Sequence, residues 1–206
     1  MLLLKVGGPI PFLHQLRRQI WSRANFLGME KTLNAESVQV PCAIEYRLRP
    51  ASKEDLEEMV RLARLEGKEA VRELVQRKWF YDCGFHDCYV ARTVKDNELC
   101  YVQWLVSRVD NKAIDDGFGN RLPRLQEDEI LVENAFTFSK YRGNRLYPSA
   151  LLQLAEVARK RGFRRMLVYV REDNIASLKG CERAGFRVFE KVPEVKLLLL
   201  TKRSHS

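Results

Sequence analysis

Apolar residues follow two different periods in the middle of the chain, and the period changes between residues 138 and 146. Ile130–Val132 and Ala135–Phe138 form an apolar, β-branched and aromatic run that is typical of a buried strand. Residues 139–144 interrupt this run with turn-forming side chains. From Leu146 the apolar residues recur at helical spacing, at positions 146, 150, 151, 154, 155 and 158. The sequence therefore predicts a strand that leads through a turn into a helix.

The same criteria predict further elements along the chain. A short strand at 45–49 ends at Pro50, and the residues from Ser52 to Asp55 form a capping box that starts a helix to about residue 65. A second helix follows Gly67. The remaining predictions are a hairpin (88–92 and 99–106), a long polar connection (110–129), a strand (166–170), a helix (174–184) closed by Gly185, and a strand pair (187–190 and 195–200) around Pro193.

The N-terminal segment has apolar residues at helical spacing from Phe12 through Leu16 and Ile20 to Ala24, among several basic residues. We expect a basic helical extension at residues 1–43, followed by one main domain at residues 44–206. A helix that binds a membrane surface or a partner is one interpretation of this segment. We favour the other, a helix packed across the main domain with its basic face in solvent.

The turn at residues 139–144 has the features of an anion site. The first N–H groups of a helix have no intrahelical partner and carry partial positive charge, so an anion is favoured there. Arg142 and Arg145 add two cations beside them. The strands that flank the Leu146 helix should be parallel neighbours, and ligands bind beyond the carboxyl ends of such strands. The second of these strands is followed by Asn174, which opens the next helix, so both motifs should meet at one site.

These two stretches together resemble the GNAT superfamily of acyl-CoA-dependent N-acyltransferases. Glu133 lies in the strand, Arg142-Gly143-Asn144 opens the turn, and NIASLKGCERAGF at residues 174–186 matches the later motif, with Asn174 at its start and Gly185-Phe186 at its end. The resemblance covers about residues 45–192. It implies an α/β (α+β) fold with a mixed, mostly antiparallel twisted sheet, flanked by helices, whose central parallel strand pair is splayed around the acyl-CoA site.

The resemblance also implies the residues that bind the donor. The backbone around residues 142–147 would hold the CoA pyrophosphate, and the strand residues before it would offer an edge to pantetheine. The donor-binding residues that we expect are Phe136, Thr137, Phe138, Arg142, Gly143, Asn144, Arg145, Leu146, Tyr147, Asn174 and Ser177. The co-substrate is expected to be acetyl-CoA or another acyl-CoA, without a metal.

Three residues are the expected catalytic groups. Glu133 lies where family members often carry the general base, and partial burial would raise the pKa of such a carboxyl group towards the working pH. Many family members protonate the leaving thiolate with a Tyr at the position of Cys181. A small buried Cys is the simpler interpretation of that residue, so solvent or Tyr147 is the alternative acid.

Two residues depart from the family pattern at the turn. Arg145 stands where the pattern has Gly, and Tyr147 stands at its final Gly or Ala. An outward-pointing Arg145 could pair with phosphate, whereas the bulk of Tyr147 must fit where the backbone approaches the donor. Pro148 suits the first turn of a helix, which needs no N–H donor there.

Composition narrows the alternatives only slightly. The 206 residues carry a net charge of +9, which favours anionic partners in general, including nucleic acid, for which no specific site is expected. No apolar run reaches the ~20 residues of a membrane span. Five scattered cysteines indicate a reducing, cytoplasmic setting. Cys83, His86 and Cys88 match no standard zinc spacing and lack a fourth ligand.

We therefore expect an enzyme that transfers an acetyl or other acyl group to a primary amine of a small molecule by direct attack. Two alternatives stay open. One is long-chain transfer from acyl-CoA or acyl carrier protein, and the other is a non-catalytic module that binds acyl-CoA. Homodimerisation is also left open.

Overall fold

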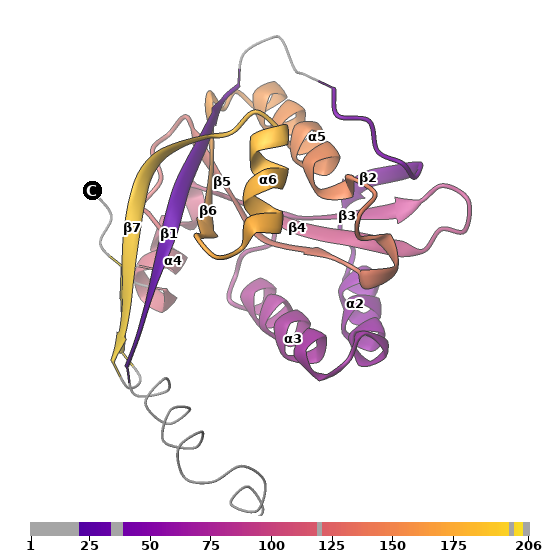
Figure 1. The fold of residues 1–206 in the computed structure, drawn as a ribbon, viewed down its shortest axis with the longest axis horizontal. Helices are drawn as coiled ribbons and strands as arrows, with labels where there is room; N and C mark the ends of the chain where they lie inside the picture. Colours follow the sequence, from indigo (N-terminus) through magenta and orange to yellow (C-terminus); the bar gives the residue numbers. More distant parts are fainter. Residues whose placement is uncertain (1–20, 34–38, 119–120, 198–199, 204–206) are drawn as a thin grey trace, which may run out of the picture.

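The computed structural model describes residues 21–33, 39–118, 121–197 and 200–203 of the chain (Figure 1). Its strands form one sheet of eight strands in the order β2-β3-β4-β5-β6-β1-β7-β8. The bounds of the strands are β1 Trp21–Thr32, β2 Tyr46–Pro50, β3 Cys88–Thr93, β4 Leu99–Ser107, β5 Glu129–Thr137, β6 Arg165–Arg171, β7 Arg187–Leu197 and β8 Leu200–Arg203.

One neighbouring pair in this sheet is parallel, and all the others are antiparallel. β5 pairs with β6 only through Glu129, Ile130 and Leu131. Beyond Leu131 no residue of β5 has a partner on β6, while β6 continues to pair with β1 up to Arg171. The central parallel strands therefore separate after their first residues, and the predicted fold class is confirmed.

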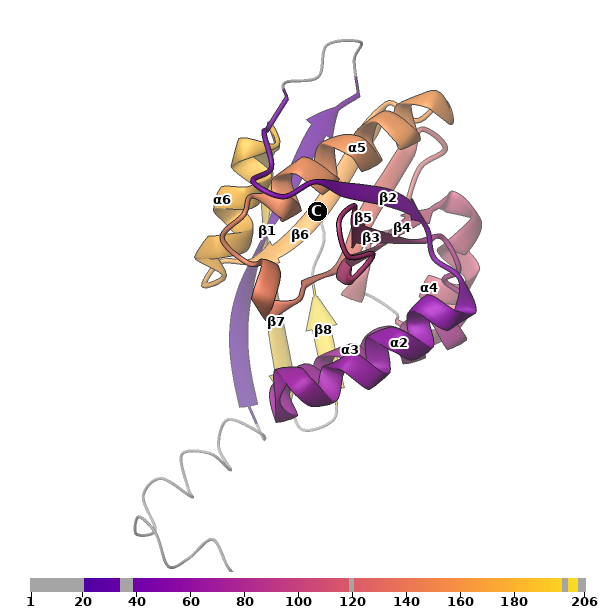
Figure 2. The same cartoon turned by 90° about the vertical axis from the view of Figure 1, so that its right-hand side faces the viewer.

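Helices cover both faces of the sheet (Figure 2). α2 Lys53–Glu66 and α3 Lys68–Asp82 lie on one face, where Leu56, Met59 and Leu74 are buried in the same hydrophobic cluster as Trp104 of β4. α5 Leu146–Lys160 and α6 Ile175–Arg183 lie on the other face, packed over β5, β6 and β1. The helices expected from Ser52, Leu146 and Asn174 are thus confirmed, and Gly185 has the left-handed φ of 84° that closes α6.

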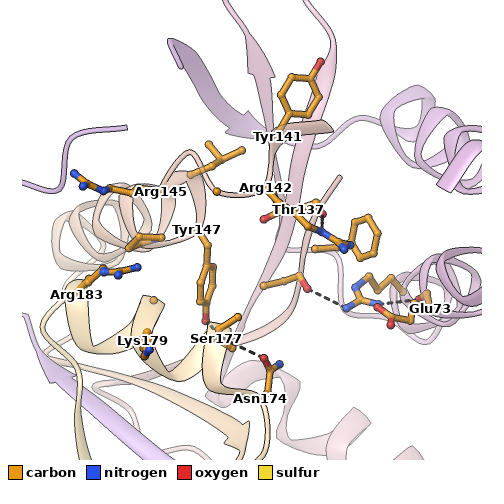
Figure 3. Close-up of a pocket in the computed structure, with 18 residues that line it drawn as sticks. Glu73, Thr137, Tyr141, Arg142, Arg145, Tyr147, Asn174, Ser177, Lys179 and Arg183 are labelled. Carbon is orange, nitrogen blue, oxygen red and sulfur yellow. Dashed lines mark hydrogen bonds and ion pairs between the residues drawn. The ribbon is translucent and has the colours of Figure 1, made fainter. Parts of the chain in front are cut away.

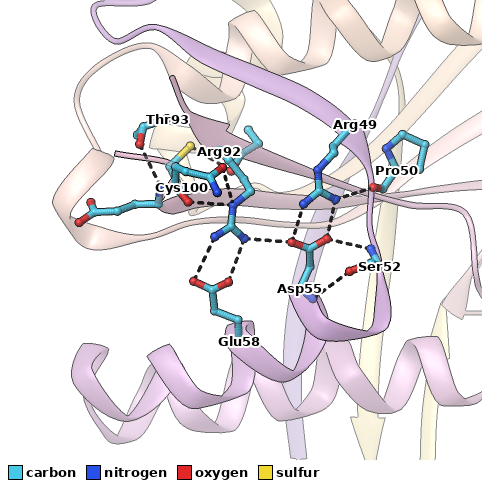
Figure 4. Close-up of polar contacts among 11 residues, drawn as sticks. Arg49, Pro50, Ser52, Asp55, Glu58, Arg92, Thr93 and Cys100 are labelled. Carbon is cyan, nitrogen blue, oxygen red and sulfur yellow. Dashed lines mark hydrogen bonds and ion pairs between the residues drawn. The ribbon is translucent and has the colours of Figure 1, made fainter. Parts of the chain in front are cut away.

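At the start of α2 the carboxylate of Asp55 binds two arginines and caps the helix (Figure 4). Asp55 accepts a hydrogen bond from the N–H of Ser52, and its own N–H donates to the Ser52 hydroxyl, which completes the expected capping box. Its buried carboxylate also binds Arg49 at 2.6 Å and Arg92 at 3.0 Å, and Arg92 continues to Glu58 at 2.8 Å. This network ties α2 to β2 and β3.

The N-terminal helix prediction is wrong over Trp21–Thr32, which forms β1 between β6 and β7. A central strand satisfies its N–H and C=O groups on both sides, and this outweighs a modest helical periodicity. Gly28 supports the strand, because it would weaken a helix interior and because a Cβ there would lie 2.6 Å from Glu190 Cγ of β7. The first part of the expected helix, with Phe12, Leu16 and Ile20, lies outside the described residues, and the boundary after residue 43 stays a prediction.

Two further predictions are corrected. Pro193 does not separate two strands, because β7 runs through it as one strand. In the described residues β8 pairs only with Glu194–Leu197, so β7 is an edge strand at Pro193. An edge strand tolerates proline, because the missing N–H has no neighbouring strand to bind on that side. The polar connection after β4 is also partly helical, with η2 Arg108–Asp110 and α4 Asn111–Gly117.

Candidate functional site

Two adjoining cavities open where β5 and β6 separate. The larger cavity has a volume of about 590 Å³ and lies between the end of β5, the start of α5 and α6 (Figure 3). The smaller cavity, of about 220 Å³, lies between β5 and β6 and contains Glu133 in its wall. Both are lined by Arg77, Ala135, Tyr147, Asn174 and Ser177. The two cavities therefore adjoin across the splayed strands, and we call them together the cleft.

The turn before α5 lies at one end of the larger cavity. Gly143 has φ of 80° and Arg145 has φ of 59°, both in the left-handed region. In the described part of the chain no hydrogen bond uses the N–H of Gly143, Asn144 or Arg145, and no side chain caps the helix N-terminus. Open N–H groups at a helix start suit an anion. We call residues 142–147, from Arg142 to Tyr147, the phosphate cradle.

Contacts with the segment before β2 fix the orientation of one peptide in the phosphate cradle. The C=O of Asn144 accepts hydrogen bonds from Ala43 N at 3.0 Å and from Cys42 Sγ at 3.2 Å. In a trans peptide the following N–H points opposite to the C=O. Because residues 42 and 43 hold the oxygen, the N–H of Arg145 is turned away from them. No local sequence motif predicts this contact.

A bulge in β5 separates the two parts of the cleft. Glu133 pairs with Trp104 and Phe136 pairs with Val102, so two residues of β5 oppose Gln103 alone. One of these two, Asn134, has a left-handed φ of 58°. Such a bulge bends the strand and re-aims its backbone groups. The strand therefore turns away from β6 at the point where the cleft opens.

Arg77 holds this bulge and was missed at the level of sequence. Its Nε donates to Asn134 O and its second terminal nitrogen donates to Ala135 O, both at 2.9 Å. Burial lowers the pKa of Arg77, and the nearby carboxylates of Glu73 and Glu133 oppose that effect. An arginine on α3 gives no local motif, so only the tertiary structure connects it with the site.

Glu133 lies in the wall of the smaller cavity, on the β6 side of the bulge. One of its carboxylate oxygens accepts a hydrogen bond from Asn134 N at 3.2 Å. The larger cavity reaches the phosphate cradle, so the cleft connects a carboxylate with an anion site. The structure thus brings Glu133 and the residues of both motifs together, and their catalytic and binding roles stay predictions.

Tyr147 and Cys181 form a contact that joins α5 to α6. The Tyr147 hydroxyl lies 3.2 Å from Cys181 Sγ and 3.5 Å from Ser177 Oγ. Burial raises the pKa of Tyr147, and the adjacent Cys181 raises it further. Burial likewise raises the pKa of Cys181 to about 11, although hydrogen bonds from Tyr147 and Ser177 oppose the shift. Both groups therefore keep their protons at neutral pH, and of the two only Tyr147 lines the cleft.

Most of the other expected donor-binding residues line the cleft, and Phe138 and Asn144 are the exceptions. Asn174 caps α6 by accepting from Ser177 N at 3.2 Å, and both residues line the cleft. Phe136, Thr137, Arg142, Gly143, Arg145 and Leu146 line the larger cavity. Phe138 instead is buried in the core and donates its N–H to Cys100 O at 3.2 Å, so its N–H is not open to a ligand. Asn144 lines neither cavity, and its side-chain amide donates hydrogen bonds to Tyr141 O and Arg142 O.

The larger cavity is strongly basic. Its wall contains five basic residues and one acidic residue, Glu73, which already pairs with Arg77 at 3.3 Å. Arg142, Arg145, Lys179 and Arg183 take part in none of the ion pairs found among the described residues. The wall therefore presents positive charge without internal neutralisation. Within the same part of the chain, no three His, Cys, Asp or Glu side chains gather as a metal site would require.

Comparison with known proteins identifies the family. The family model described as an acetyltransferase (GNAT) domain matches residues 46–187, which is more than half of the chain, so the chain belongs to the GNAT family. This matched span includes Glu133, the phosphate cradle and α6, while β1 lies before it. A comparison with curated proteins gave no significant match. No helix in the described part of the chain is long and apolar enough to cross a membrane.

Solved structures show the same fold. A GCN5-related glucosamine N-acetyltransferase region of a fungal multi-domain GH3 β-N-acetylglucosaminidase aligns with a TM-score of 0.62 at 12% identity, over 88% of this chain and 22% of that one. A GNAT-family acetyltransferase from Colwellia psychrerythraea aligns with a TM-score of 0.58 at 14% identity, over 86% and 57%. A GCN5-related N-acetyltransferase from Sphaerobacter thermophilus aligns with a TM-score of 0.56 at 13% identity, over 93% and 57%. This chain therefore spans less than two thirds of each of these proteins.

Proposed function

We propose that this protein is an N-acetyltransferase that transfers an acetyl group from acetyl-CoA to a primary amine of a small molecule. The observation that carries the proposal is the cleft between β5 and β6, whose two adjoining cavities contain the open anion cradle and Glu133. Membership of the GNAT family supports the same reaction class. A cytoplasmic location is part of the proposal, and the five free cysteines are compatible with it.

The residues present fit each part of a CoA thioester. The N–H groups of Gly143, Asn144 and Arg145 would hold the pyrophosphate, and Asn174 and Ser177 face the path of the pantetheine arm. The backbone of Ala135 to Thr137, next to the bulge, would line the other side of that arm. The thioester would then reach the shared walls of the two cavities.

The proposed chemistry is direct attack of the amine on the thioester carbonyl. Glu133 accepts a proton from the amine, directly or through water, so that a neutral nitrogen forms the new C–N bond as the C–S bond breaks. Tyr147 donates a proton or a hydrogen bond to the leaving sulfur, because its hydroxyl is protonated at neutral pH and the residue lines the cleft. Cys181 lies behind Tyr147 and is assigned a packing role.

The size of the smaller cavity supports a short acyl group. Its volume is about 220 Å³, against about 590 Å³ for the cavity at the phosphate cradle. This space suits an acetyl group with a small amine better than a long acyl chain. Long-chain transfer from CoA or acyl carrier protein thus has less structural support than acetyl transfer.

The test is calorimetric titration of the full chain with acetyl-CoA and a long-chain acyl-CoA, together with a thiol-release assay on a panel of amines. We expect saturable acetyl-CoA binding and amine-dependent thiol release. Glu133→Gln should lower kcat by about 10²–10³-fold and remove the acidic limb of the pH profile, with donor affinity unchanged. Glu127→Gln is the matched control, because Glu127 is 89% exposed and does not line either cavity.

The outcomes separate the alternatives. Donor binding without turnover on any amine, insensitive to Glu133→Gln, would favour a non-catalytic acyl-CoA-binding module. Preference for the long-chain donor would favour the long-chain reaction. Failure to bind either donor would refute the proposal.

A further inference from the structure

Three cationic side chains in the wall of the larger cavity form a group separate from Arg142. Arg145 precedes α5, whereas Lys179 and Arg183 come from α6 one helical turn apart. In Figure 3 their side chains lie together on one side of Tyr147, and Arg142 and Thr137 lie on the other side. We call Arg145, Lys179 and Arg183 the basic cluster.

Within the described part of the chain, no ion pair accounts for the side chains of the basic cluster. The ion pairs among the described residues use many other arginines and lysines, but none uses a member of this cluster. Arg142 differs, because its Nε donates to Thr137 O at 3.0 Å and its guanidinium lies 5.6 Å from the Phe136 ring centroid. The cluster therefore keeps its donors for solvent or a ligand.

The backbone of Arg145 strengthens this inference. A non-glycine residue at φ of 59° costs of the order of 1 kcal/mol, and glycine would avoid that cost. No side-chain hydrogen bond or ion pair within the described residues compensates Arg145 for this conformation. Strain of this kind persists where the side chain has a use, and a cation beside an anion cradle has one.

Charge balance indicates the class of ligand. With Glu73 and Arg77 paired, four positive side chains remain in the cavity wall. A CoA thioester carries about four negative charges at neutral pH, two on the pyrophosphate and nearly two on its 3′-phosphate monoester. In the proposed function the cradle amides and Arg142 would bind the pyrophosphate. Charge of a second phosphate would then match the basic cluster.

We propose that Arg145, Lys179 and Arg183 bind the 3′-phosphate of the donor and so select free CoA thioesters over donors that lack this group. The inference rests on the proposed function and deepens it. A phosphopantetheine arm on a carrier protein has no 3′-phosphate, so it leaves the basic cluster without a ligand. Arginine and lysine are suited to such a dianion, through charge-assisted hydrogen bonds.

The test is calorimetry with acetyl-CoA and with acetyl-3′-dephospho-CoA at one fixed ionic strength, because screening changes such contacts. The proteins are the wild type, the Lys179→Ala, Arg183→Ala double variant, and an Arg61→Ala, Arg64→Ala control on α2. The control removes the same charge from exposed residues that do not line the cavity. Thermal melting confirms that each variant is folded.

We expect the wild type to bind acetyl-CoA at least about tenfold more tightly than its dephospho form, which corresponds to ~1.4 kcal/mol. The double variant should lose this preference by weakening only acetyl-CoA binding, and the control should keep it. Equal affinity of the wild type for both donors would overturn the inference and leave the proposed function intact. An equal loss for both donors in the double variant would assign these cations to the pyrophosphate instead. Binding of neither donor by the wild type would overturn the proposed function as well.

Discussion

The ring of Tyr147 lies against Gly180, so closely that a Cβ added at Gly180 would lie 2.5 Å from Tyr147 Cδ1. A large residue on α5 is thus accommodated by the smallest possible residue on α6. The contact also directs the Tyr147 hydroxyl to Cys181 and Ser177. It explains how a bulky side chain fits at a position where the family pattern has Gly or Ala.

The first prediction is that Gly180→Ala destabilises the protein, although the same change inside a helix is normally stabilising. The added Cβ must displace the Tyr147 ring, which should cost about 1–3 kcal/mol and lower the melting temperature by roughly 2–10 °C. Displacement of the hydroxyl should also lower kcat more than it changes the KM for the donor. Thermal melting and steady-state kinetics measure both effects.

The control for this change is the Tyr147→Ala, Gly180→Ala double variant. Without the Tyr147 ring there is no clash with the added Cβ. Gly180→Ala should therefore lower the melting temperature in the wild type but not in the Tyr147→Ala protein. The catalytic rate should not recover, since the hydroxyl is gone. If Gly180→Ala costs the same stability in both proteins, the ring of Tyr147 and the Cβ at position 180 do not clash.

The second prediction concerns Arg77, which binds the carbonyls of the β5 bulge. Arg77→Lys keeps the charge but cannot donate to Asn134 O and Ala135 O from one planar group. We expect a loss of about 1–2 kcal/mol in unfolding free energy and about a tenfold lower kcat/KM. The reason is that the backbone next to the thioester path loses its support.

Arg72→Lys serves as the control for Arg77, since it makes the same substitution at an exposed position of α3. It should leave both the unfolding free energy and the kinetics unchanged. If Arg77→Lys behaves like this control, Arg77 does not support the bulge in solution.

Much of the fold was predictable because its local signals agree with its tertiary structure. Ser52 and Asp55 predict a helix start, and the long apolar face after Leu146 predicts a helix whatever the topology. The places of Glu133, the phosphate cradle and Asn174 in the fold were predictable because each lies within a local motif, while their roles stay predictions.

The remaining features depend on contacts between residues far apart in the chain. β1 forms because β6 and β7 both pair with it, and no local sequence pattern predicts its position between these two strands. Arg77 and Ala43 donate hydrogen bonds to backbone carbonyl oxygens of residues far away in the chain. Such contacts leave no local sequence motif. No local motif marks Gly180, which in the structure leaves space for the ring of Tyr147.

The third prediction tests the segment that holds the phosphate cradle. Ala43→Pro removes the N–H that binds Asn144 O at 3.0 Å, so the peptide between Asn144 and Arg145 should lose its fixed orientation. We expect the Kd for acetyl-CoA to rise about fivefold to tenfold, which corresponds to ~1 kcal/mol. Calorimetric titration measures this change.

Ala43→Gly is the matched variant, because it alters the same residue and keeps the N–H. Its affinity for acetyl-CoA should stay close to that of the wild type. Equal weakening in both variants would mean that the Ala43 side chain or local stiffness matters, and that this hydrogen bond does not orient the cradle.

The fourth prediction follows from the charges around Asp55 (Figure 4). Burial of Asp55 would raise its pKa, but hydrogen bonds from Arg49 and the Ser52 N–H outweigh it and lower the pKa to about 2. Since the folded pKa lies below the unfolded value of ~3.9, the stabilisation is fully present above about pH 4 and is lost as the pH falls towards 2. Asp55→Asn should therefore cost about 2 kcal/mol at pH 7, a value reduced for the exposure of Arg49.

The measurement is urea unfolding of wild type and Asp55→Asn at a series of pH values from 7 to about 2. The difference in unfolding free energy should be constant above about pH 4 and should narrow below it, because protonation makes Asp55 resemble asparagine. Glu57→Gln on the exposed side of α2 is the control, and its difference from wild type should be small at every pH. A difference for Asp55→Asn that does not narrow on acidification would show that the capping geometry, rather than the charge of Asp55, stabilises the start of α2.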